Sequence, residues 1–286
     1  MIKRIICTLF ALILSFSICG CGFSQNESIQ AETNIESEVK DGYYIITTDY
    51  MTFYFSTKDF GGNEILEIKD EAVMIMNEIH DYLNAGHSGK GSVCYFDSTY
   101  VDENGLSRSY CYPEDKVIYC LSLYDFVHEY VHIVMENNTE LVYVPADIFR
   151  EGFAQYVSLN FFDNISESSY SFFKEPPISK NSNEAEHNQI SKLLTDNDLE
   201  YNAKNYTKAF VYLYSRNYDL SELDTSSDFY NYYVGYLLTE YCVNELGGLN
   251  RFISVYYDSI TIEETYGKTL YEIINKACDN NEKLFK

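Results

Sequence analysis

Three residues of this sequence have the types and the spacing that metal chemistry requires: His128, Glu129 and His132, in the order H-E-x-x-H. On an α-helix, positions i and i+4 lie on the same face, so the two imidazoles can bind a single metal ion. Glu129 follows His128 directly and can reach a water at that metal. Zinc suits such a site, because imidazole nitrogen and carboxylate oxygen both bind it and a fourth position stays open.

The segment that carries this motif is predicted to be a buried helix. Leu123–Asn137 is apolar on nearly every side of a helical projection. Burying Glu129 and two histidines costs several kcal/mol unless something compensates their polar groups, and a metal ion does so. The alternative is a helix whose histidines are satisfied by ordinary hydrogen bonds.

Glu151 is the candidate for a third ligand, eighteen residues after His132. The residues 145–147, Pro-Ala-Asp, are typical of a helix start, because Pro is tolerated in the first turn and Asp is favourable there. Two helices joined by a short loop can pack antiparallel and direct Glu151 at the histidine pair. Gly152 beside it allows the helices to approach closely. Gln155, about one turn later, is a candidate to orient a ligand.

These residues resemble the gluzincin zinc peptidases, and most closely their aminopeptidase-N-like branch. The shared pattern is H-E-x-x-H, eighteen residues, then E followed by G-F-A. The resemblance implies that His128, His132 and Glu151 bind one zinc ion per chain and that Glu129 is the general base. Together with the match described next, it covers Leu121 to about Phe252, roughly half the chain.

A second match lies downstream, in Tyr232-Tyr233-Val234-Gly235. It resembles the Y-x-x-G segment of the same branch, whose tyrosine hydrogen-bonds the developing oxyanion. That role carries over to Tyr232, with Tyr233 as the alternative. Because the chain has 29 tyrosines, a packed aromatic on a helix is the competing interpretation of Tyr232. The chain has no G-x-M-x-N segment, which in that branch holds the amino terminus of the substrate.

The amino-terminal residues predict export and a lipid anchor. Met1–Gly20 reads as a signal, with Lys3 and Arg4 before the apolar run Ile5–Ile18. Gly20 before Cys21 resembles a bacterial lipobox, so cleavage after Gly20 would leave Cys21 as the lipid-modified first residue. The alternative is an ordinary signal peptide with a nearby cysteine. Residues 21–40 are polar and predict a disordered tether that leaves the folded part extracytoplasmic, anchored to the cell membrane.

Charge and cysteine content restrict the partners. A formal net charge of −24 argues against nucleic acid and against a polybasic membrane patch. It would favour cationic peptides by long-range attraction, although a merely soluble surface is the better explanation of the charge. A disulfide between two of Cys94, Cys111 and Cys120 is compatible with an exported protein, and no particular pair is predicted.

The fold class predicted for residues 41–286 is α+β. Residues 41–163 should hold a small mixed or antiparallel sheet and the zinc helices, residues 164–200 a long loop, and residues 201–286 a mostly helical subdomain. Composition and periodicity predict strands at Tyr43–Thr48, Met51–Ser56, Val93–Asp97, Ser107–Tyr112 and Val117–Leu121. They predict further helices at Asn63–Leu83, Ala203–Arg216, Phe229–Leu246, Asn250–Asp258 and Leu270–Ala277. By resemblance, Val117–Leu121 or Ser107–Tyr112 would pair with extended substrate.

The function expected from these features is hydrolysis of peptide bonds by an extracytoplasmic, lipid-anchored zinc metallopeptidase. Its partners would be a peptide or protein substrate and the membrane, reached through Cys21. A narrow maturation protease with a single substrate is one competing interpretation. Another is a surface lipoprotein that keeps zinc and uses the fold as a binding or adhesion module.

Overall fold

The computed structural model describes residues 38–84, 89–100, 109–136, 146–162, 184–215, 225–257 and 261–286. The predicted signal, Cys21 and residues 21–37 of the predicted tether lie outside the described residues. In the described part of the chain, no helix is long and apolar enough to cross a membrane. The described cysteines are free thiols: Cys94, Cys111, Cys120, Cys242 and Cys278.

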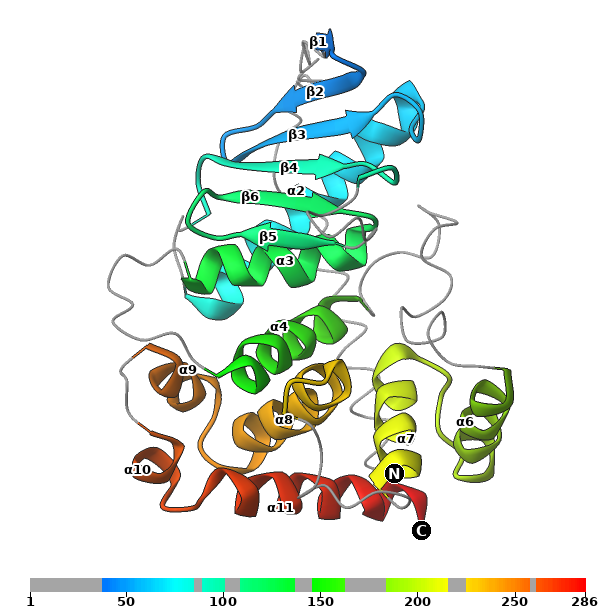
Figure 1. The fold of residues 1–286 in the computed structure, drawn as a ribbon, viewed down its shortest axis with the longest axis vertical. Helices are drawn as coiled ribbons and strands as arrows, with labels where there is room; N and C mark the ends of the chain where they lie inside the picture. The colour runs from blue at the N-terminus through cyan, green and yellow to red at the C-terminus, as the bar shows by residue number, and fades with distance from the viewer. Residues whose placement is uncertain are drawn as a thin grey trace, which may run out of the picture. The chain divides into compact units, whose positions relative to one another are not determined.

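Six strands form one mixed sheet (Figure 1). They are β1 (Glu38–Lys40), β2 (Tyr43–Thr47), β3 (Met51–Ser56), β4 (Ser92–Phe96), β5 (Tyr110–Tyr112) and β6 (Val117–Cys120). Their order in the sheet is β1-β2-β3-β4-β6-β5. The β3–β4 and β4–β6 pairs are parallel and the other neighbours are antiparallel. The predicted α+β class with a mixed sheet is therefore confirmed.

Helices account for the rest of the described fold. They are α2 (Gly62–Leu83), α3 (Leu123–Glu136), α4 (Asp147–Phe162), α6 (Glu184–Asp196), α7 (Ala203–Ser215), α8 (Gly235–Glu245), α9 (Leu249–Tyr257), α10 (Ile262–Tyr266) and α11 (Leu270–Glu282), with the π-helical turn η3 (Phe229–Val234) and the short 3₁₀ helix η4 (Lys283–Phe285). Helix α3 packs against β5, β6, α2 and α4, and α4 packs in turn against η3 and α8.

The inner face of the sheet forms the core with α2 and α3. Residues of β3 and β4 alternate between buried and half-buried, as expected for strands covered on one face. Phe53 and Phe96 point inward, and their ring centroids lie 6.1 and 6.0 Å from that of Phe126 on α3. This aromatic contact fixes α3 against the sheet two residues before His128.

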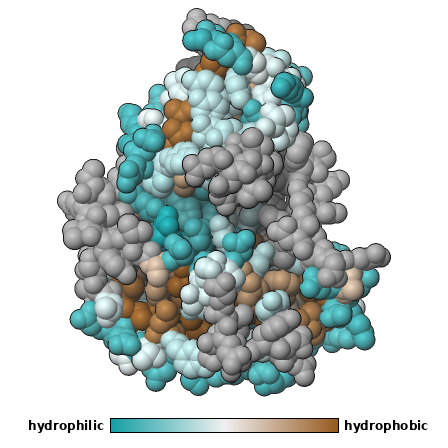
Figure 2. All heavy atoms as spheres, in the orientation of Figure 1, coloured by the Kyte–Doolittle hydropathy of each residue, from teal (hydrophilic) through white to brown (hydrophobic). Residues whose placement is uncertain are grey.

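The outer face carries a line of tyrosines, one from each of four adjacent strands, that we call the tyrosine row: Tyr54, Tyr95, Tyr119 and Tyr110. They are direct cross-strand partners. Successive ring centroids are 4.6, 5.0 and 5.1 Å apart, and the rings are stacked. In Figure 2 the described surface over the sheet is mostly pale or teal, whereas brown atoms gather over the helices below it.

Three expectations require correction. Glu38–Lys40, assigned to the tether, forms β1 because its backbone pairs with β2. Residues 164–200 are not simply a loop, since α6 occupies Glu184–Asp196, where Ile190 and Leu194 are buried against α7. Val117–Leu121 cannot add a substrate strand, because β6 is paired on both sides, with β4 and β5. Among the described strands next to α3, only β5 lies at an edge of the sheet.

Candidate metal centre

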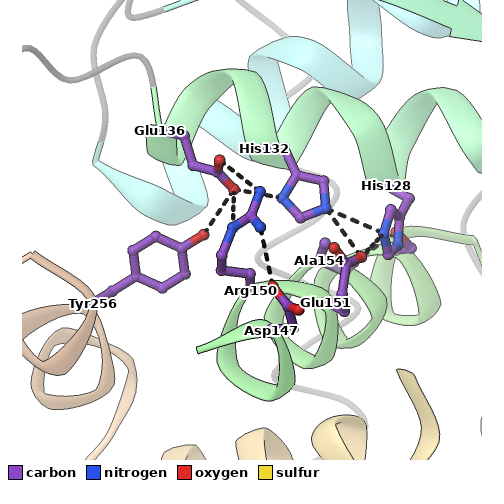
Figure 3. A network of polar contacts seen from close by, with 9 residues as sticks. His128, His132, Glu136, Asp147, Arg150, Glu151, Ala154 and Tyr256 are labelled. Carbon is purple, nitrogen blue, oxygen red and sulfur yellow. Dashed lines mark hydrogen bonds and ion pairs between the residues drawn. The ribbon is translucent and has the colours of Figure 1, made fainter. Parts of the chain in front are cut away.

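Three side chains from two helices converge on one point. His128 and His132 project from α3, and Glu151 projects from α4. The Nε2 atoms of the histidines are 3.3 Å apart, and Glu151 Oε2 lies 3.1 Å from His128 Nε2 and 3.3 Å from His132 Nε2 (Figure 3). Both histidines are buried, and Glu151 is partly buried. In the described part of the chain this is the one group of three or more such side chains that could hold a metal ion.

The three atoms are spaced like ligands of a single small ion. Ligand bonds of about 2.0–2.1 Å in tetrahedral geometry place neighbouring donor atoms about 3.3–3.4 Å apart. The observed separations of 3.1–3.3 Å match that spacing closely. Two imidazole nitrogens and one carboxylate oxygen are also the donor set of many catalytic zinc sites, with room left for a fourth ligand. The residues present therefore fit a bound metal ion.

Local sequence explains how the two helices present these ligands. Asp147 begins α4, as predicted, and α3 ends at Glu136. Arg150, in the first turn of α4, bonds Glu136 in the last turn of α3, while Glu151 meets both His132 and His128. The helices therefore run in opposite directions, as Figure 3 shows.

Electrostatics within the cluster are dominated by its carboxylates. Burial alone would lower the pKa of His132, but Glu151 and Glu136 raise it to about 10. Burial acts to raise the pKa of Glu151, but His132 and His128 hold it well below its usual range. The Glu151 carboxylate and the His132 imidazole thus stabilise each other's charged forms. A bound metal cation would neutralise the same carboxylate in place of the proton on the imidazole.

Glu129 lies beside the cluster and is buried, with 9% of its surface exposed. Burial raises the pKa of Glu129, and His128 and His132 act in the opposite direction. The thiol of Cys111, on edge strand β5, donates a hydrogen bond to this carboxylate. Burial raises the pKa of Cys111, so its thiol stays protonated and able to donate. From sequence, Cys111 was a candidate only for a disulfide, and no sequence pattern signals its contact with Glu129.

His128, His132 and Glu151 are together called the ligand cluster below, and Tyr232 reaches this cluster from η3. Its ring stacks on the imidazole of His128, with centroids 5.3 Å apart and planes at 20°. Its hydroxyl bonds Glu151, and burial with the nearby Glu151 raises the pKa of Tyr232. Tyr233, the alternative, points elsewhere and contacts the rings of Phe210 and Phe229. Of the two neighbouring tyrosines, the structure therefore brings Tyr232 to the ligands.

Two glycines explain how Tyr232 comes so close. Gly152 follows ligand Glu151 on α4, and Gly235 follows Tyr232 by three residues at the start of α8. A Cβ on Gly152 would overlap the backbone of Gly235, and one on Gly235 would lie 2.5 Å from the carbonyl oxygen of Ile148. The helices α4 and α8 thus touch backbone to backbone. The glycine of the E-G pair, Gly152, and the glycine of Y-x-x-G, Gly235, therefore pack directly against each other.

A second carboxylate, missed in the sequence, meets His132. Glu136 Oε1 lies 2.8 Å from His132 Nδ1. The spacing of four residues between them was an available signal, because i and i+4 share a helix face. Gln155, predicted to orient a ligand, is buried and lies near the hydroxyl of Tyr124.

Comparisons with known proteins identified no relative of this chain. No family model matches the chain, and neither the curated proteins nor the solved structures contain a significant match to it. The residues of the site are therefore the only basis for a proposed function.

Proposed function

We propose that this protein is a zinc metallopeptidase that hydrolyses peptide bonds outside the cytoplasm, anchored to the membrane through a lipid on Cys21. The observation that supports the proposal most is the convergence of His128, His132 and Glu151 within 3.1–3.3 Å of one another. The resemblance to gluzincins rests on the same residues. Zinc is the proposed metal, since this donor set suits it and leaves a position open.

In the proposed reaction, the three converging residues hold the metal and Glu129 moves the proton. His128, His132 and Glu151 would hold a zinc ion, which would supply Lewis acidity for activating a water and polarising the scissile carbonyl. Glu129 accepts the proton of that water and delivers it to the leaving amine. Its burial and raised pKa favour proton uptake over an exposed carboxylate.

Tyr232 is the proposed donor to the oxyanion that develops on the scissile carbonyl. Its hydroxyl already lies at hydrogen-bonding distance from Glu151, and its raised pKa keeps the donor protonated. A single donor of this kind contributes about 3–4 kcal/mol to stabilisation of a transition state. The stacking of its ring on His128 limits the directions in which the hydroxyl can point.

The proposal is tested by incubating the purified zinc-loaded chain with a peptide library and sequencing the products. We expect cleavage by the wild type and a rate roughly 10²- to 10⁴-fold lower for Glu129→Gln. A matched control is Glu240→Gln, on α8, whose carboxylate bonds Lys208 and Tyr236. Zinc uptake with no cleavage of any library peptide would contradict the peptidase and favour a binding module. Equal cleavage by Glu129→Gln would exclude the proposed base.

A further inference from the structure

Around His132, the described contacts use both ring nitrogens. Nε2 faces His128 and Glu151 in the ligand cluster, and Nδ1 lies 2.8 Å from Glu136 Oε1. A carboxylate can only accept, so Nδ1 carries the proton and donates it. With Nδ1–H committed to Glu136, the lone pair of Nε2 is left for a metal.

The carboxylate of Glu136 is itself held by two further side chains. Arg150 donates to both of its oxygens, from Nε to Oε1 at 2.9 Å and from Nη2 to Oε2 at 2.8 Å. Tyr256 on α9 donates to Oε1 at 3.3 Å (Figure 3). The side chain of Glu136 is only 12% exposed, so little water competes for these contacts. Paired guanidinium bonds fix the plane of a carboxylate as well as its position.

Arg150 connects the carboxylate of Glu136 to the ligand cluster, because it is covalently joined to Glu151. It immediately precedes the ligand Glu151 on α4, and its Nη1 also lies 3.3 Å from Asp147 Oδ1. The contacts of His128 are of another kind, since its ring stacks on Tyr232. Glu136, Arg150 and Tyr256 therefore act on one imidazole of the pair, from three different helices.

We propose that Glu136 is a positioning residue that fixes the ring of His132 for metal binding, and that Arg150 and Tyr256 hold Glu136 in place. The inference rests on the proposed metal centre and extends it. An imidazole free to rotate or to exchange tautomers must be ordered when the metal binds, whereas one fixed in advance need not be. The network therefore contributes to metal affinity without touching the metal.

The chain offers a matched control for a merely structural carboxylate. Glu240 on α8 bonds Lys208 Nζ at 2.8 Å and accepts from the hydroxyl of Tyr236 at 2.9 Å. It resembles Glu136 in having one cationic and one phenolic partner, and its side chain is 24% exposed. Its described bonds include no histidine. Replacing it removes comparable contacts and leaves the ligand cluster untouched.

The experiment compares zinc affinity, by competition with a chromophoric chelator, in the full chain and in Glu136→Gln and Glu240→Gln. We expect Glu136→Gln to weaken zinc binding roughly 10- to 100-fold, as loss of such partners does elsewhere. Glu240→Gln should bind zinc like the wild type. Cobalt substitution gives a second readout, because its visible spectrum reports ligand geometry, and only Glu136→Gln should shift it.

Two further variants keep the test decisive if Glu136→Gln does not fold. Arg150→Gln should weaken zinc binding less than Glu136→Gln does, and Tyr256→Phe less again, in the order of the bonds each removes. Equal zinc affinity in all folded variants would overturn the inference, because the network would then be structural only. The readouts need no peptide cleavage, so loss of the proposed peptidase activity alone leaves the inference standing. A wild-type chain that takes up no metal would overturn both.

Discussion

The ligand cluster on α3 and α4 and the tyrosine row on the sheet both bring ionisable side chains into contact, with opposite results. In the row, stacked rings lie 4.6–5.1 Å apart, and burial raises the pKa of Tyr95 and of Tyr119, so these two phenols stay neutral. In the cluster, imidazole nitrogens and a carboxylate oxygen point at one another at 3.1–3.3 Å.

The difference shows what distinguishes a site from a dense patch. Stacking stabilises the rings of the tyrosine row, and a phenol without charge requires no metal ion or counter-ion. Carboxylates and imidazoles that converge in a buried position need a proton or a metal between them, because unpaired charge there is costly. Convergence of lone pairs, and not the number of titratable groups, therefore identifies the candidate metal centre. The variants below test this contrast.

The largest effect is expected from His132→Ala, which removes one of the three converging ligands. Bound zinc and peptide cleavage should both be lost, because two ligands do not retain the ion. Zinc content after dialysis against a mild chelator measures this. The control is His187→Ala, since His187 contacts the rings of Tyr201 and Tyr206 and no ligand. Retention of zinc by His132→Ala would show that the cluster is not the metal centre.

Glu129→Gln should separate catalysis from metal binding. We expect the cleavage rate to fall roughly 10²- to 10⁴-fold, the usual contribution of a general base, while zinc content stays at the wild-type level. Steady-state kinetics beside metal analysis of the same sample check both halves. Loss of zinc together with activity would indicate that Glu129 supports the site and is not its base.

Tyr232→Phe should lower kcat roughly 10²- to 10³-fold with little change in KM, because a hydrogen bond made in the transition state is lost. Its neighbour provides the control: Tyr233→Phe should leave kcat unchanged, since Tyr233 contacts Phe210 and Phe229 instead. Equal effects of the two substitutions on kcat would mean that Tyr232 only packs on His128.

Gly235→Ala tests the close contact between α4 and α8. The added Cβ would lie 2.5 Å from the carbonyl oxygen of Ile148, so the helices must separate. Overpacking of this kind lowers the free energy of unfolding by about 1–3 kcal/mol, measurable by urea denaturation. Gly62→Ala is the control, because a Cβ there meets nothing within 4 Å. Wild-type stability in Gly235→Ala would mean that the helices do not touch there.

The smallest effect is expected in the tyrosine row. Tyr95→Phe keeps the stacked ring and removes one hydroxyl, so the free energy of unfolding should change by no more than about 0.5 kcal/mol. Zinc affinity should equal that of the wild type. A clear loss of zinc in Tyr95→Phe would contradict the claim that the tyrosine row, unlike the ligand cluster, has no role in metal binding.

Periodicity predicted the elements whose apolar pattern is strong. The helix expected at Asn63–Leu83 is α2, and the strand expected at Met51–Ser56 is β3. Helix α6 was missed because its sequence is mostly polar, and Ile190 and Leu194 become buried only against α7. β1 was missed for a similar reason: three exposed residues carry no pattern, and their pairing with β2 decides the structure.

At the site, local spacing predicted the residues that α3 presents and the one that the next helix adds. His128, Glu129 and His132 follow from i and i+4 geometry, and Glu151 from a short helix connection. Contacts that depend on tertiary packing left no such signal: Tyr256 reaches Glu136 across 120 residues. The hydrogen bond from Cys111 to Glu129 likewise depends on where β5 joins the sheet.

The central claim is that His128, His132 and Glu151 hold one zinc ion, and anomalous diffraction at the zinc edge tests it most directly. Crystals of the purified chain grown with zinc should show about one ion per chain, about 2.0–2.2 Å from the Nε2 atoms of both histidines and from a Glu151 oxygen. Crystals of His132→Ala should lack that peak. A folded wild-type chain with no zinc at this point, or with zinc bound elsewhere, would contradict the account.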